Sequence, residues 1–141
     1  MKKKQILFLS MLIVLLMLIS CAPSTKQVLA TKESQVQLRA IQTRAFDTTD
    51  RDKMLRTVIA TLQDLGFIVD KADNVLGAVS ATKLDRYTLR MTVSVRPRGE
   101  TQLLVRANAQ YNITAVEDPE PYQQFFDALS KAIFLTAHQV D

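Results

Sequence analysis

Two segments of the chain alternate between apolar and polar positions, which is the period of a strand that buries one face. In residues 87–95 the apolar set is Tyr87, Leu89, Met91, Val93 and Val95. In residues 103–113 it is Leu103, Val105, Ala107, Ala109, Tyr111 and Ile113. Residues 96–100 between them supply a proline and a glycine, which are typical of turns. The pattern therefore predicts a β-hairpin.

Two other segments repeat their apolar residues at helical spacing. Helical spacing begins at Asp50. Thr49 and Asp52 are three residues apart, as in a capping box, and Gly66 lies where a helix would end. The stripe between comprises Met54, Leu55, Val58, Ile59, Leu62 and Leu65. Near the C-terminus, Asp118 and Pro119 have the character of a helix start. The second stripe comprises Tyr122, Phe125, Phe126, Leu129, Ala132 and Ile133. We expect two amphipathic helices.

Three further segments have the character of shorter strands. Residues 36–46 alternate roughly and lose phase near Ile41, which predicts a strand with a possible bulge. Residues 67–71 and 76–83 predict two strands around a polar turn at 72–74. The predicted order is β-α-β-β-β-β-α, and short links between consecutive strands favour antiparallel pairing. The expected fold is a two-layer α+β domain over residues 35–141, with both helices on one face of an antiparallel sheet.

The N-terminal segment differs from the rest because it is almost entirely apolar. Three lysines precede an apolar run of about 14 residues, which is shorter than the roughly 20 residues of a transmembrane helix and typical of a signal peptide. The residues that end it, Leu18, Ile19, Ser20 and Cys21, resemble the lipobox of bacterial lipoproteins. That resemblance implies cleavage before Cys21 and acylation of its thiol. We therefore predict a signal peptide over residues 1–20 and a lipidated cysteine with a flexible tether over residues 21–34.

Cys21 is the only cysteine in the chain, so no internal disulfide is possible. The alternatives are a free thiol in an ordinary exported protein and a membrane helix with a chance cysteine. An odd cysteine in an exported chain favours a special use, and two or three acyl chains would anchor the protein stably. By the sorting rule of Gram-negative lipoproteins, Ala22 after the cysteine implies the outer rather than the inner membrane, with the domain facing the periplasm.

The positive charge of the chain belongs mostly to the predicted signal peptide. The whole chain has a net charge of +4, but without Lys2, Lys3 and Lys4 it keeps 15 basic and 14 acidic side chains, a net charge of about +1. A near-neutral mature chain gives no argument for binding nucleic acid. We therefore expect no nucleic-acid partner.

Few residues suggest catalytic chemistry. The single histidine, His138, has no cluster of metal-binding residues near it in sequence, and the three glycines are too far apart for a phosphate-binding loop. No serine lies in a nucleophile-elbow motif. Asp47, Asp50 and Asp52 cluster where a helix is expected to begin, and the helix dipole favours negative charge there. We expect no catalytic residue, no metal site and no cofactor.

The polar positions of the predicted hairpin include candidate binding residues, namely Arg90, Arg96 and Arg106. Arginine makes planar, bidentate contacts with carboxylates and is enriched at interfaces, so these residues are a candidate partner surface. The alternative is an ordinary solvated sheet face, on which arginine and threonine serve solubility and strand propensity.

The run DKMLRTVIATLQDLGFIVDKADNVLGAVSATK, residues 52–83, resembles small bacterial outer-membrane lipoproteins with helix-grip domains. The lipoprotein C subunit of the outer-membrane β-barrel assembly machine is an example. The predicted order also resembles the TATA-binding-protein-like topology. The resemblance implies a non-catalytic accessory or scaffold subunit that contacts an envelope protein complex and is held to the membrane through Cys21. A periplasmic carrier of a small apolar ligand or lipid, held between helices and sheet, is the alternative.

Overall fold

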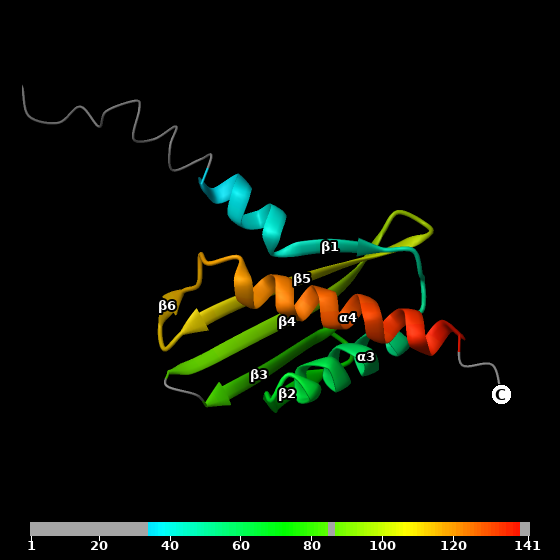
Figure 1. Ribbon diagram of the computed structural model, residues 1–141. Coiled ribbons are helices and arrows are strands. Elements are labelled where there is room, and N and C mark those ends of the chain that lie inside the picture. The colour runs from blue at the N-terminus through cyan, green and yellow to red at the C-terminus, as the bar shows by residue number, and fades with distance from the viewer. Residues whose placement is uncertain (1–33, 85–86, 139–141) are drawn as a thin grey trace, which may run out of the picture. The chain divides into compact units, whose positions relative to one another are not determined.

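The computed structural model describes residues 34–84 and 87–138 (Figure 1). The described residues from 36 to 138 belong to one compact unit. The predicted signal peptide, Cys21 and all but the last residue of the predicted tether lie outside the described residues. Within the described residues, no helix is both long and apolar enough to cross a membrane.

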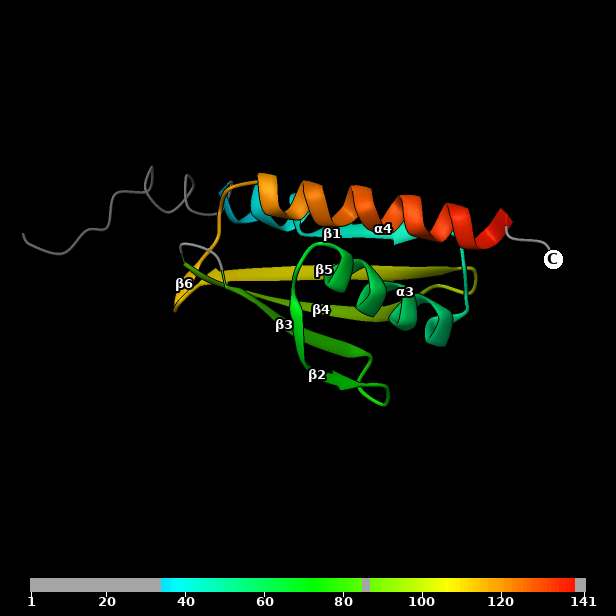
Figure 2. The same cartoon turned by 60° about the horizontal axis from the view of Figure 1, so that its bottom comes forward.

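A six-stranded antiparallel sheet forms one layer of the fold. Its strands are β1 (Thr43–Phe46), β2 (Ile68–Asp73), β3 (Ala78–Leu84), β4 (Thr88–Arg98), β5 (Gln102–Tyr111) and β6 (Thr114–Ala115). They lie in the order β1-β5-β4-β3-β2, and β6 also pairs with β5. Helices α3 (Arg51–Asp64) and α4 (Glu120–His138) lie on the same side of this sheet (Figure 2). The predicted two-layer α+β class is therefore confirmed.

The central hairpin pairs the two segments of clean alternation. Val93 lies opposite Ala107 and Val95 opposite Val105, so the apolar side chains of both strands share the face beneath the helices. These side chains are at most 2% exposed from Met91 to Val95 and from Leu103 to Ala109. Tyr87, Tyr111 and Ile113 continue the same parity but are 66%, 40% and 92% exposed. The expectation that they belong to the core is wrong, because the helical layer leaves this end of the sheet exposed.

The N-cap of helix α3 lies one residue after the predicted capping threonine, Thr49. Asp50 is the N-cap, and its Oδ1 accepts a hydrogen bond from the backbone N–H of Lys53 at 2.9 Å. The predicted box of Thr49 and Asp52 is therefore wrong, because the Asp50 carboxylate satisfies the first-turn donor. The helix ends at Asp64 with Leu65 as its C-cap, and the next residue, Gly66, has a φ of +83°, which suits a residue without a Cβ.

The apolar stripes of both helices face the sheet, as predicted. In α3 the side chains of Met54, Leu55, Val58 and Leu62 are at most 4% exposed. In α4 those of Tyr122, Phe125, Phe126 and Leu129 are at most 1% exposed. Helix α4 begins at Glu120, one residue later than its sequence suggests, and the Asp118 carboxylate accepts from the Glu120 N–H at 3.0 Å.

The predicted strand at residues 36–46 is wrong over most of its length. Residues 34–41 form a helix, and only Thr43–Phe46 join the sheet as β1. Leu38 and Ile41, three positions apart on one helix face, pack against the core, whereas Val36 is 66% exposed. The apparent alternation of Val36, Leu38 and Ala40 hid this i, i+3 pair, and the bulge near Ile41 is the helix end.

The two short strands lie slightly later than predicted. β2 and β3 are joined by a turn at residues 74–77 rather than 72–74. The Asp73 carboxylate accepts from the Leu76 N–H at 2.8 Å, and Gly77 has a φ of +67°. Position 77 requires glycine for a second reason, since a Cβ there would lie 2.7 Å from the Val95 carbonyl oxygen and would also meet the Arg51 guanidinium.

The outer edge of β5 is shared by two short strands, β1 and the unpredicted β6. Between them, the buried hydroxyl of Tyr122 accepts from the Ala109 N–H at 3.2 Å and donates to the Val116 carbonyl at 2.7 Å. The Gln42 side-chain amide also donates to this hydroxyl, at 3.2 Å. Tyr122 therefore supplies the hydrogen bonds that a continuous edge strand would otherwise make.

Candidate functional site

The face of the sheet opposite the helices carries all three predicted arginines. Arg90 lies opposite Gln110, Arg96 opposite Leu104 and Arg106 opposite Ser94, so their parity is opposite to that of the buried residues. Six residues separate Arg90 from Arg96, a distance of roughly 20 Å along the strand. Arg106 is a diagonal neighbour of Arg96, at roughly 7 Å. The structure therefore brings two of the three close together and leaves Arg90 at a distance.

A fourth arginine, Arg98, belongs to the same face, and the sequence analysis missed it. Strand β4 extends through Pro97 to Arg98, which lies opposite Gln102. The prediction placed Arg98 in the turn at 96–100 instead of in the strand. Because it lies two residues after Arg96, it belongs to the same face of the sheet. We call the surface formed by Arg90, Arg96, Arg98 and Arg106 the arginine face.

The arginine face has no acidic side chain on its central strands. β1, β3, β4 and β5 contain no Asp or Glu at all. The acids bonded to this part of the sheet lie at its edges. Asp70 on β2 accepts a hydrogen bond from the Thr82 hydroxyl at 2.6 Å. Asp47, just after β1, accepts one at 2.6 Å from Gln102, which lies opposite Arg98. The ion pair found among the described residues joins Arg44 to Asp127 of α4 at 3.3 Å, on the helical side. Within that part of the chain, no arginine of this face is paired with an acid.

The four arginines differ in how they are held. Arg90, Arg96 and Arg98 are exposed, whereas Arg106 is half-buried. The Nε of Arg106 is buried and lacks a hydrogen-bond partner among the described residues. The hydroxyls of Ser80 and Thr92 lie 3.2 Å apart between the arginines. Exposed guanidinium groups on a rigid, polar surface can bind carboxylates in a bidentate manner.

The clustered aspartates near residue 50 have structural roles. Asp50 caps α3, and the Asp47 carboxylate accepts a hydrogen bond from the Gln102 side chain at 2.6 Å. Asp52 lies in the first turn of α3, where the helix dipole favours it. Among the described residues, no group of three His, Cys, Asp or Glu side chains is arranged to hold a metal ion. His138 lies at the end of α4.

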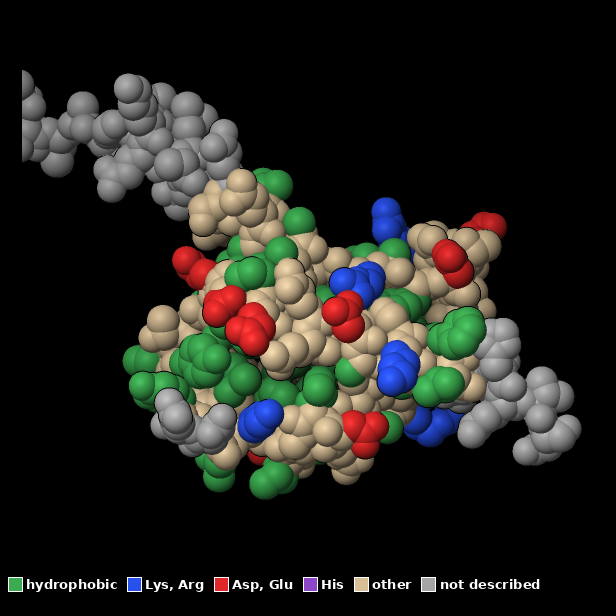
Figure 3. All heavy atoms as spheres, viewed as in Figure 1, with side chains coloured by type: hydrophobic (Ala, Val, Ile, Leu, Met, Phe, Trp, Pro, Cys, Tyr) green, Lys and Arg blue, Asp and Glu red, His purple; other side chains and the backbone are tan. Residues whose placement is uncertain are grey.

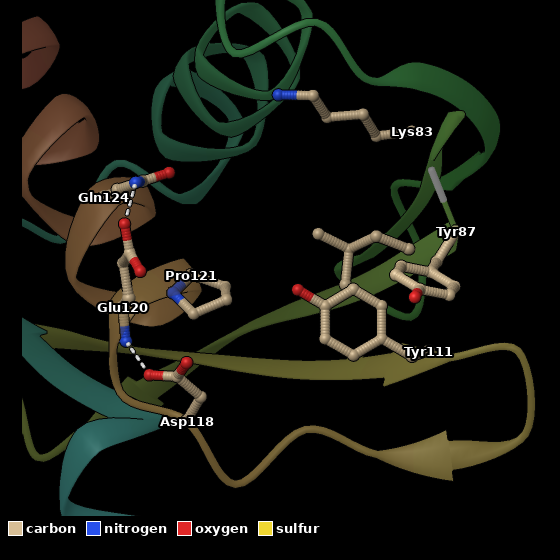
Figure 4. Close-up of a pocket in the computed structure, with 8 residues that line it drawn as sticks. Lys83, Tyr87, Tyr111, Asp118, Glu120, Pro121 and Gln124 are labelled. Carbon is tan, nitrogen blue, oxygen red and sulfur yellow. Dashed lines mark hydrogen bonds between the residues drawn. The ribbon is translucent and has the colours of Figure 1, made fainter. Parts of the chain in front are cut away.

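A cavity of about 270 Å³ opens at the end of the sheet where α4 begins (Figure 4). Tyr87, Leu89 and Tyr111 line it from the sheet, and Pro121 and Gln124 line it from α4. The space between the layers themselves is filled, since Val58, Leu62 and Phe125 have no exposed surface. The tyrosines were expected in the core because alternation alone does not show where the helical layer stops.

Fold and surface together define the class of this protein as a two-layer antiparallel α+β domain with an uncovered basic sheet face. Compared with known protein families and with curated proteins, the chain matches no family model and no curated protein. The resemblance to helix-grip envelope lipoproteins therefore stays a prediction.

Proposed function

We propose that this protein is a non-catalytic, lipid-anchored lipoprotein of the bacterial outer membrane. It faces the periplasm and serves as an accessory or scaffold subunit of an envelope protein complex. In this proposal the lipid on Cys21 holds the chain at the membrane, and the arginine face binds an acidic surface of the partner protein.

The observation that supports this proposal is the charge pattern of the uncovered sheet face. Four arginines lie on strands without a single acidic residue, and no ion pair within the described residues neutralises them. A face selected only for solubility would be expected to mix both signs of charge. An uncompensated face of one sign favours a partner of opposite charge.

The mechanism requires no chemical step. Anchoring to a membrane confines the domain to a thin layer and raises its effective concentration near a complex in the same membrane. Unpaired arginines steer association and set its orientation. A weak contact through the arginine face would then be sufficient for a stable association.

In-cell crosslinking followed by purification of the full-length protein tests the anchoring part of the proposal. The comparison is between the natural chain and a Cys21→Ala variant. We expect one envelope complex to be recovered with the natural chain and lost with the variant, because the variant cannot be acylated. Equal recovery of the same complex from both chains would contradict the role of the anchor.

Charge reversal on the arginine face tests the docking part. Arg90→Glu with Arg96→Glu should abolish the crosslink. Both side chains are exposed, and each substitution turns attraction to an acidic partner surface into repulsion. Arg106 is a poorer choice because its Nε is buried. The matched control is Arg56→Glu with Lys131→Glu, which makes the same charge change at exposed positions of α3 and α4. A crosslink that survives the first pair as well as it survives the control would contradict the surface assignment.

A second candidate function, carriage of a small apolar ligand, is favoured by the cavity beside Leu89. Its volume of about 270 Å³ lies slightly below the roughly 300–1,000 Å³ of pockets that enclose drug-sized ligands. Native mass spectrometry of the gently purified protein checks this function. A retained mass beyond the covalent acyl chains would support it, and a bare mass would count against it.

A further inference from the structure

The cavity at the end of the sheet has an aromatic corner. The rings of Tyr87 and Tyr111 meet edge to face, with centroids 6.2 Å apart and planes at 67°. Both rings remain substantially exposed, at 66% and 40%. The negative face of an aromatic ring attracts cations, and recognition of ammonium groups by such rings is a recurrent use of this property.

The opposite wall of the cavity is acidic. Asp118 and Glu120 line it beside Pro121, and neither forms an ion pair within the described residues. Each has one oxygen in a local hydrogen bond, because Asp118 accepts from the Glu120 N–H at 3.0 Å and Glu120 accepts from the Gln124 side chain at 3.1 Å. Figure 3 shows acidic side chains gathered beside hydrophobic ones at the left of the view, where α4 begins.

The start of α4 does not offer an anion site. A helix N-terminus binds anions through its unpaired N–H groups. Here the Glu120 N–H is already bonded to Asp118, and the next residue is Pro121, which has no N–H. This end of the helix therefore presents carboxylates rather than donors to the cavity.

Lys83, which also lines the cavity, has its charge engaged elsewhere. Its Nζ donates to the Leu65 carbonyl at the end of α3 at 3.0 Å and lies 5.9 Å from the centroid of the Phe67 ring. A lysine at a helix C-terminus is held there by the helix dipole. In Figure 4 it lies across the cavity from Glu120. Among the described residues that line the cavity, two carboxylates and one engaged ammonium give a net negative charge.

We propose that this cavity binds a small organic cation, namely a primary or quaternary ammonium group on a short aliphatic chain. The ammonium group contacts the faces of Tyr87 and Tyr111 and is balanced by Asp118 and Glu120. Such a group is carried by free solutes and by phospholipid headgroups. The proposal does not depend on the arginine face, which lies on the other side of the sheet.

Tyrosine fluorescence of the full-length protein, purified in a nonionic detergent, tests the proposal directly. The chain has no tryptophan and three tyrosines, and the third, Tyr122, is fully buried. The signal that a ligand changes therefore comes from the cavity. The probes are choline and 3,3-dimethylbutan-1-ol, which share a shape and differ in charge. We expect a saturable change with choline and none with the alcohol. No change with choline, or equal changes with both, would overturn the proposal.

Neutralising the acidic wall provides the second measurement. Asp118→Asn with Glu120→Gln should lower the affinity for choline by roughly threefold to tenfold, as expected for two partly exposed charge contacts. Asparagine keeps the oxygen that caps the Glu120 N–H, so the helix start is preserved. The matched control is Glu117→Gln with Glu100→Gln, two exposed positions outside the cavity. If both pairs lower the affinity for choline equally, the effect comes from the net charge of the protein, and the assignment of the site to this cavity is overturned.

A third arm distinguishes the two sources of the ammonium group. Phosphatidylethanolamine added to the detergent micelles is compared with soluble ethanolamine at the same concentration, with phosphatidylglycerol as the anionic control. A stronger response to the phosphatidylethanolamine micelles than to ethanolamine supports a headgroup ligand, and an equal response supports a free solute. A response to phosphatidylglycerol as strong as to phosphatidylethanolamine would overturn recognition of the ammonium group.

Discussion

The two faces of the sheet are built from the same strands but have opposite characters. On β4, Met91, Val93 and Val95 are at most 1% exposed beneath the helices. Their immediate neighbours Arg90 and Arg96 are exposed on the other side. The covered face is held by packing, whereas the uncovered face holds little that the fold depends on.

This difference shows where the chain has freedom to evolve a binding surface. Replacing a covered residue leaves a void or a clash, because interiors are densely packed. Replacing an exposed residue mainly changes charge and hydrogen bonding with water, at a cost usually within about 0.5 kcal/mol. The three exposed arginines of the uncovered face, Arg90, Arg96 and Arg98, are therefore unexplained by stability and available for function.

The sharpest test of the comparison uses adjacent residues of β4. Met91→Ala should lower the free energy of unfolding by about 2–5 kcal/mol, because it empties a site that is 1% exposed. Thr92→Ala, on the other face, should cost about 1 kcal/mol or less, for a lost contact with Ser80 and lower strand propensity. Urea unfolding of the full-length protein, followed by circular dichroism, measures both. Equal losses would mean that the uncovered face also carries the fold.

Two glycines with positive φ test whether a turn residue close to the helical layer contributes more to stability than one far from it. Gly77→Ala should cost about 2–4 kcal/mol, because a Cβ would add a clash with Arg51 and Val95 to the cost of a left-handed backbone. Gly99→Ala should cost only about 1 kcal/mol, since no atom lies within 4 Å of its Cβ position. The two midpoints of thermal unfolding give the comparison. If they coincide, the contact between α3 and the turn at 74–77 is not tight.

Tyr122→Phe separates packing from hydrogen bonding on the covered side. The ring is retained, but the Ala109 N–H, the Val116 carbonyl and the Gln42 amide lose their partner. We expect a loss of about 1–3 kcal/mol in the free energy of unfolding, typical of buried polar groups left unpaired. Tyr111→Phe, at a 40% exposed position, is the control and should be close to neutral. A neutral Tyr122→Phe would show that the edge of β5 is held by other contacts.

The smallest effect on stability is expected for the arginine face itself. Arg90→Glu with Arg96→Glu should change the free energy of unfolding by at most about 0.5 kcal/mol per site, although it should abolish partner crosslinking. The same unfolding measurement checks it against Arg56→Glu with Lys131→Glu. A large destabilisation by the first pair alone would assign these arginines to the fold rather than to a partner.

Much of the fold follows from local sequence patterns, with identifiable exceptions. The stripe from Met54 to Leu62 fits only the helical period, and the alternation from Met91 to Ala109 fits only the period of a strand. Helix α3 and strands β4 and β5 were therefore predicted correctly. Residues 36–41 were assigned to a strand because Val36, Leu38 and Ala40 alternate, and so short a stretch does not reveal the i, i+3 pair of Leu38 and Ile41. β6 comprises two residues, too few to show any period, and it is a strand only because it pairs with the end of β5.

The candidate sites divide in the same way. Arg90, Arg96 and Arg106 were found because parity along a strand places them on one face. Arg98 was missed because Pro97 and Gly99 favour a turn in isolation, although the hairpin continues past the proline. The cavity was missed entirely, since Tyr87 and Tyr111 have the same parity as the core.

By itself, the sequence determined helices α3 and α4, the long strands β4 and β5, and the side of the sheet on which their residues lie, because these depend on periods of 3.6 and 2 residues within a single element. Only the tertiary structure decided where the helical layer stops, which tyrosines it leaves exposed and which acids line the same cavity. Tyr87, Tyr111 and Glu120 lie around that cavity because packing of the whole core places the start of α4 beside this end of the sheet.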